Sequence, residues 1–211
     1  MGAMLDSPAT SSFEEREART APRTGGVAGN ARLTGTVAVA LLVLLAAEGA
    51  TIVFIGKWLG AHMFIGLLLI PPVALKLGST GWRFLRYYAH DARYVRKGPP
   101  PIVLRVLAPA VVVTTIAVFV TGVALLFVGP PAHTLILVHK VSFIAWVAFM
   151  SLHVLGHLLE LPRLASADWR RHGPREARLA GAGMRASVLA LAIVAGVALG
   201  FVALSVGRPW L

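Results

Sequence analysis

The sequence predicts an all-α integral membrane protein with five transmembrane helices, on the strength of its composition and of its apolar segments. Of its 211 residues, 57% are hydrophobic and only 14% are charged, whereas soluble domains have roughly 25% charged residues. Five apolar stretches also reach the length of roughly 20 residues that a helix needs to cross a bilayer. They lie at about 33–56, 61–82, 103–128, 134–159 and 184–206.

The segment before the first span is polar and small. Residues 1–30 cannot bury enough apolar surface to fold alone, so we expect a disordered cytoplasmic tail followed by a helical domain at 31–211. The first span could be a signal peptide, but its apolar run continues to Gly56, which favours a retained helix. The acid in this span, Glu48, could accept a proton from a quinol; alternatively it bonds to a neighbouring helix or faces water.

The second span begins near His62 and carries Gly66 one turn later. Pro71 and Pro72 interrupt it midway and predict a kink, because proline has no backbone N–H to donate. Arginines and aromatic residues follow in the loop after residue 82, as is typical of a belt that contacts lipid headgroups.

The fourth span carries three histidines, His139, His153 and His157. A helix turns by about 100° and rises by about 1.5 Å per residue. The three side chains therefore project from one face at two depths, with His139 near the outer surface. Polar groups are costly within a bilayer, so histidines there indicate function. His62 lies at the same depth as His139 on the second span.

The fifth span contains Gly196 and Gly200 in a Gly-x-x-x-Gly pattern among alanines. Such a face allows two helices to approach closely. The pattern predicts either packing within the bundle or a homodimer through this helix, and it does not distinguish them.

The basic residues predict how the helices are oriented. The tail and the loops after residues 82 and 159 are rich in arginine, whereas the loops at 57–60 and 129–133 carry only Lys57. By the positive-inside rule, we expect a multi-pass protein of the bacterial inner membrane with the N-terminus in the cytoplasm and the C-terminus outside. This distribution accounts for the net charge of +11 without nucleic acid, and the lack of cysteine excludes disulfides and thiolate metal sites.

Matched histidines on two helices are the ligands that a haem needs, since its iron takes one axial ligand from each side of a flat ring. His62 and His139 form such a pair by depth, and Gly66 would leave room for a porphyrin against the backbone. Lys76 either extends to the cytoplasmic face or pairs with a haem propionate.

Two segments resemble a known family. "HMFIGLLLIPPVALKL" at 62–77 and "HKVSFIAWVAFMSLHVLGHLLE" at 139–160 are similar to helices 2 and 4 of the bacterial cytochrome b561 group, which includes the b-type cytochrome subunits of hydrogenases and formate dehydrogenases. The resemblance covers about residues 33–160. It implies a four-helix core that holds haem b, with the fifth helix added, and electron transfer between quinone or quinol and a partner redox enzyme. His62 and His139 would ligate an outer haem and His153 an inner one.

The chain departs from this family at the inner ligand. The family usually has a histidine near the cytoplasmic start of helix 1, where this chain reads "NARLTGTVAVA", and the residue 14 positions after His62 is Lys76. We therefore expect one haem, with two remaining open; His90 could fold back to the inner site. If the protein binds haem as the resemblance implies, it is an electron-transfer subunit rather than a stand-alone enzyme.

Other interpretations compete for the same residues. His153 and His157, one turn apart with Glu160 one turn further on, could bind zinc, or could form hydrogen bonds with backbone or lipid headgroups. His157 fits the interface better than a ligand role. The chain as a whole could instead be a non-haem membrane scaffold or a small transporter.

Overall fold

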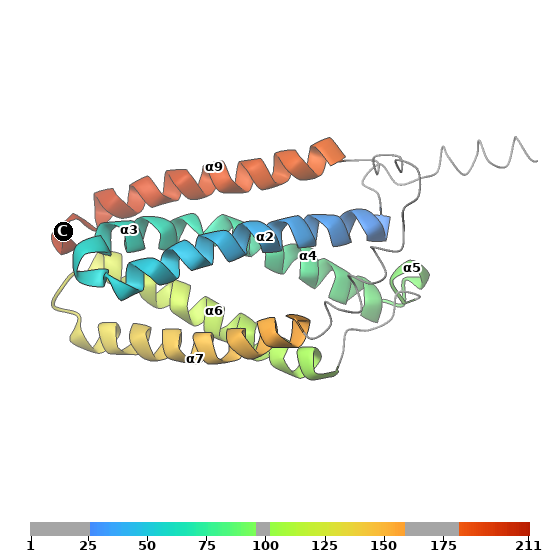
Figure 1. Ribbon diagram of the computed structural model, residues 1–211, viewed down its shortest axis with the longest axis horizontal. Coiled ribbons are helices and arrows are strands. Elements are labelled where there is room, and N and C mark those ends of the chain that lie inside the picture. Colours follow the sequence, from blue (N-terminus) through green and yellow to red (C-terminus); the bar gives the residue numbers. More distant parts are fainter. Residues whose placement is uncertain (1–25, 96–101, 159–181) are drawn as a thin grey trace, which may run out of the picture.

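The computed structural model describes residues 26–95, 102–158 and 182–211, and these residues form helices without strands. The α-helices are α2 (Gly26–Val53), α3 (Ile55–Leu68), α4 (Ile70–Tyr88), α5 (Ala92–Val95), α6 (Ile102–Val128), α7 (His133–Leu158) and α9 (Ala182–Val206), and a 3₁₀ helix, η1 (Arg208–Trp210), ends the chain (Figure 1).

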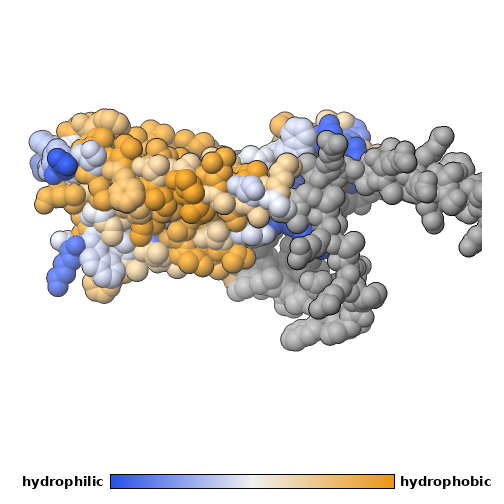
Figure 2. All heavy atoms as spheres, turned by 90° about the horizontal axis from the view of Figure 1, so that it is seen from above, coloured by the Kyte–Doolittle hydropathy of each residue, from blue (hydrophilic) through white to orange (hydrophobic). Residues whose placement is uncertain are grey.

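Five helical segments are long and apolar enough to cross a membrane, with α3 and α4 together counted as one of them. Large apolar side chains are exposed along all five. On the face in Figure 2, hydrophobic residues form a broad band between hydrophilic ends. The chain is therefore an all-helical, multi-pass membrane protein, as its composition predicted.

The predicted boundaries of the first two spans were wrong by about two turns in places. Helix α2 begins at Gly26, so the last part of the predicted tail, residues 26–30, is helical, while the rest of that tail lies outside the described residues. The predicted loop at 57–60 is present in shortened form: Phe54 separates α2 from α3, and Trp58, with a φ of −116° and a ψ of 24°, kinks the chain within the first turns of α3. His62 lies one turn after this kink, close to the predicted start of the second span.

The interruption of the second span falls at Leu69, just before the two prolines. Pro71 and Pro72 occupy the first turn of α4, where a missing N–H is tolerated. The hydrogen bonds from Leu69 N to Ile65 O, 2.9 Å, and from Val73 N to Leu69 O, 3.0 Å, carry the helical path across the junction. Leu69 keeps helical dihedral angles, with a φ of −67° and a ψ of −25°, so the prolines lie at the start of α4 in a continuing helical path, and the kink itself stays a prediction.

The helices pack in two groups. Helices α2, α3, α4 and α9 pack against one another, and α6 and α7 form an antiparallel pair beside them (Figure 1). Gly129, with a φ of 83°, permits the tight turn between α6 and α7. The buried side chains of Met63, Leu126 and Ala203 join α3, α6 and α9 near the C-terminal end of the chain.

The glycines of α9 pack against another helix of the same chain. A Cβ atom at Gly200 would lie 2.9 Å from the Phe64 carbonyl oxygen, and one at Gly196 would overlap the carbonyl oxygen of Leu68. The amide of residue 72 would ordinarily bond to that Leu68 carbonyl, but residue 72 is a proline. Of the two alternatives for the Gly-x-x-x-Gly face, packing within the bundle is the one that the structure contains.

Candidate functional site

The structure brings His62 of α3 and His139 of α7 together. Their ring centroids are 6.4 Å apart and their planes are inclined at 71°. His62 lies one turn after the kink at Trp58, and His139 lies nearly two turns after the start of α7 at His133. The matched depth that the sequence indicated is thus present in the folded chain.

His62 is held by the helix before it. Its Nδ1 lies 2.8 Å from Glu48 Oε1 and 3.2 Å from Thr51 Oγ1, both on α2. The Thr51 hydroxyl donates to the Glu48 carbonyl oxygen at 2.6 Å, so its oxygen is directed to accept. Glu48 is 13% exposed and bonds to His62 of the neighbouring helix. Of a bond to a neighbouring helix and contact with water, the two alternatives that the sequence left open, the structure has the first.

Gly66 faces this carboxylate. A Cβ atom at Gly66 would lie 3.5 Å from Glu48 Oε1, in ordinary contact. The sequence interpretation assigned this position to clearance for a porphyrin, which stays a prediction. In the structure Gly66 lies beside the Glu48 carboxylate.

His139 is held by α6. Its Nδ1 lies 2.8 Å from Thr121 Oγ1, and the Thr121 hydroxyl donates to the Ala117 carbonyl oxygen at 2.7 Å. Because the single hydroxyl proton is directed to Ala117, the Thr121 oxygen accepts a hydrogen bond from His139 Nδ1–H. A Cβ atom at Gly122 would lie 3.2 Å from His139 Cε1, so the ring packs closely on the α6 backbone.

Thr121 belongs to a set of contacts that the sequence interpretation missed. Trp146 of α7 donates from Nε1 to Thr115 Oγ1 at 2.9 Å, in the same way that His139 donates to Thr121. Two threonines of α6 thus accept from two ring N–H groups of α7. Threonines in an otherwise apolar helix were the available signal, because polar groups in a bilayer need partners.

These partners determine which nitrogen of each ring carries the proton. A neutral imidazole has one N–H and one lone pair. Glu48 and Thr121 both accept at Nδ1, so both lone pairs are left on Nε2. Metal-binding histidines are oriented by the same kind of Nδ1–H hydrogen bond to a carboxylate or another acceptor. Each ring therefore keeps its Nε2 lone pair available for a metal ion.

The ligand set is too small for a typical zinc site. Among residues 26–95, 102–158 and 182–211, no group of three or more His, Cys, Asp and Glu side chains is placed to hold a metal ion. Structural zinc needs four protein ligands and catalytic zinc three. Two imidazoles from facing helices match a haem iron, whose remaining four ligands come from the porphyrin.

The inner half of the bundle contains a network of polar side chains between α2 and α4. Lys76 Nζ donates to the Thr34 carbonyl oxygen of α2 at 2.9 Å, so the side chain reaches sideways instead of along its helix. Thr34 Oγ1 donates to Ser79 Oγ at 3.1 Å, and Asn30 Nδ2 to the Ser79 carbonyl oxygen at 3.1 Å. We call these four residues the inner polar network; they join α2 to α4.

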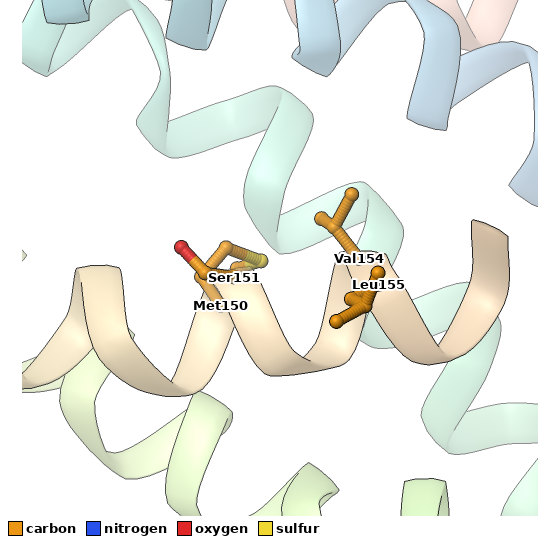
Figure 3. Close-up of a pocket in the computed structure, with 4 residues that line it drawn as sticks. All are labelled: Met150, Ser151, Val154 and Leu155. Atoms are coloured by element: carbon orange, nitrogen blue, oxygen red, sulfur yellow. The ribbon is translucent and has the colours of Figure 1, made fainter. Parts of the chain in front are cut away.

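His153 lies half-buried on α7. Other residues of this helix, Met150, Ser151, Val154 and Leu155, line a shallow hollow of about 330 Å³ (Figure 3). All four lining residues belong to α7, so the hollow has one wall and does not enclose a ligand. His90 lies in the turn after α4, with a φ of 57°. The His157 side chain and Glu160, on which the zinc alternative depends, lie outside the described residues.

Comparison of the chain with models of protein families, with curated proteins and with solved structures gives no match.

Proposed function

We propose that this protein is a membrane b-type cytochrome in which His62 and His139 are the axial ligands of one haem b. The observation that supports the proposal most is the pair of imidazoles whose Nδ1 atoms are held by Glu48 and Thr121, which leaves two Nε2 lone pairs for one metal ion. Metal–imidazole bonds of about 2.0–2.1 Å on both sides would separate the ring centroids by roughly 6 Å. The observed separation is 6.4 Å.

Helix packing around the pair is compatible with a planar ligand. Helix α7 packs along α6 and has at most sparse backbone contacts with the other helices. The centroids of the two histidine rings are 6.4 Å apart across this interval between α3 and α7. A bound haem would supply reversible one-electron chemistry at this position. Glu48, Thr51 and Thr121 would orient the rings and prevent them from rotating.

One haem is proposed rather than two because the described residues of the inner half do not include a second pair of facing histidines. His153 is present on α7, but the position 14 residues after His62 is Lys76, which is bonded to Thr34 within the inner polar network. That network occupies the interface between α2 and α4 near which the related cytochromes have their second inner histidine.

The chain would pass electrons between the quinone pool and a partner redox enzyme. Its connecting segments are short, and it has no motif for a flavin or nicotinamide cofactor, so the partner must supply any further chemistry. We propose that it lies in the bacterial inner membrane with its arginine-rich end in the cytoplasm.

A haem count tests the proposal. The full chain is expressed in a bacterial host, purified in detergent and assayed by pyridine haemochrome, together with His62→Ala, His139→Ala and the matched intramembrane control His153→Ala. We expect one haem per chain in the wild type and in His153→Ala, and almost none in the other two variants.

The other outcomes are distinct. A colourless wild type whose histidine variants assemble normally contradicts the proposal and favours a membrane scaffold or small transporter. Two haems per chain, falling to one in His153→Ala, would mean that the inner site is also occupied and that the single-haem proposal is wrong.

A further inference from the structure

A second hollow lies at the arginine-rich end of the bundle, where α4 ends, away from His62 of α3. It has a volume of about 340 Å³ and is lined by residues of α2, α4, α5 and α9. Unlike the hollow on α7, it therefore has walls on several helices. Its volume falls in the range of about 300–1,000 Å³ that small-molecule sites occupy. We call it the arginine pocket, after Arg86, Arg93 and Arg185, which line it.

The pocket carries excess positive charge. The acid that the structure pairs with its arginines is Asp91, whose Oδ2 lies 3.3 Å from Arg86 Nη2 and whose Oδ1 lies 3.7 Å from Arg93 Nε. Among the described residues, one carboxylate thus faces two guanidinium groups of the lining. Such a balance favours an anion in the pocket, and guanidinium groups match phosphate oxygens in geometry.

The arginines are held in place by an ordered turn. His90, with a φ of 57°, reverses the chain after α4, and Asp91 Oδ1 accepts from the Arg93 backbone N at 3.0 Å, which caps the short helix α5. This turn places Arg93 beside Arg86. The Arg86 guanidinium also lies 5.1 Å from the centre of the Trp82 ring, in a cation–π contact.

The rest of the lining indicates a lipid. Trp82 and Tyr94 are residues that gather at the headgroup level of membranes, and apolar side chains of α2 and α9 line the pocket together with the arginines. A free phosphate would use the charges alone, whereas a phospholipid uses the charges for its phosphate and the apolar wall for its glycerol and acyl chains. We propose that the arginine pocket binds the headgroup of an anionic phospholipid.

Lipid retention by the purified full chain tests this proposal, and it does not depend on haem. Native mass spectrometry compares wild type with Arg93→Gln and with the double variant Arg86→Gln/Arg93→Gln, after exposure to phosphatidylglycerol, to phosphatidylcholine or to inorganic phosphate. Arg105→Gln is the matched control, because it removes the same charge from the same end of the bundle but does not line the pocket.

We expect the wild type and Arg105→Gln to retain phosphatidylglycerol and not phosphatidylcholine. Each arginine removed should weaken retention about fivefold, as expected for a basic residue at a membrane surface. Arg93 is 59% exposed, so its replacement tests the proposal even if the double variant does not fold. Equal retention of the two lipids, unchanged retention in Arg93→Gln, or displacement of the lipid by inorganic phosphate would each overturn it.

Discussion

At the scale of single residues, the two histidines differ in the partner at Nδ1. His62 faces a carboxylate, Glu48, and His139 faces a hydroxyl, Thr121. An ionised acceptor makes a stronger hydrogen bond than a neutral one and gives the ring more imidazolate character. In a bound haem, this would make His62 the stronger donor and stabilise the oxidised iron.

Glu48→Gln should therefore weaken the site without abolishing it. The amide keeps the shape of the side chain but loses the charge, so we expect haem affinity to fall by about tenfold and the midpoint potential to rise. Haem titration of the apoprotein and a redox titration of the loaded protein measure the two effects. An unchanged affinity together with an unchanged potential would mean that Glu48 does not act on His62.

Thr121→Val should act on the other ring. Valine has a similar volume, but it removes the acceptor for the His139 Nδ1–H and leaves a donor without a partner inside the bundle, which costs about 1–3 kcal/mol. We expect weaker haem binding, read from the same titration. Thr114→Val is the control, because the Thr114 hydroxyl likewise donates to a carbonyl of α6, at 2.7 Å, and its recorded bonds stay within α6.

Sequence reasoning could find the histidine pair but not its partners. Depth along a helix follows from counting residues, so His62 and His139 were matched before their contacts were known. The contacts of Glu48 and Thr121 depend on how α2 and α6 are rotated and displaced relative to α3 and α7. Nothing in the linear pattern specifies those rotations, and the contact between Gly66 and Glu48 was consequently not predicted.

At the scale of helices, α9 is fitted to α3 through its glycines. The Leu68 carbonyl, which Pro72 leaves without its usual helical partner, points at Gly196, and Phe64 contacts Gly200. Close contact between small residues is a main source of helix association in membranes, where burial of apolar surface adds little. Pro72 of α4 and the glycines of α9 therefore contribute to the same helix interface.

Gly196→Ala should disrupt this interface. The added methyl group would overlap the Leu68 carbonyl oxygen, and overpacking of this kind costs about 1–3 kcal/mol. We expect a lower Tm in detergent. Gly35→Ala in α2 is the control, since a Cβ atom there has nothing within 4 Å, and removing a mid-helix glycine should leave the Tm unchanged or raise it. An unchanged Tm in Gly196→Ala would mean that α9 is not packed as described.

At the scale of the whole molecule, hydropathy predicts the number of spans well and their arrangement poorly. All five spans were found because length and apolar content are properties of a continuous segment. Their order in space was not, because a helix that is apolar all round does not reveal which face meets protein and which meets lipid. The connection between the first two spans was placed at 57–60, a few residues after Phe54, because the residues around Phe54 are as apolar as the spans.

The orientation of the molecule can be tested without altering its fold, because the chain contains no cysteine and each introduced thiol is unique. Lys57, Arg93 and Arg208 are exposed. A Cβ atom at Gly60 would lie 3.3 Å from Leu211, so the start of α3 and the C-terminus share one end, and Lys57→Cys and Arg208→Cys must label from the same side. By the positive-inside rule, a membrane-impermeant maleimide should label both in intact spheroplasts, and Arg93→Cys only after permeabilisation. The reverse pattern would invert the proposed topology, and labelling of Lys57→Cys and Arg208→Cys from opposite sides would contradict the fold itself.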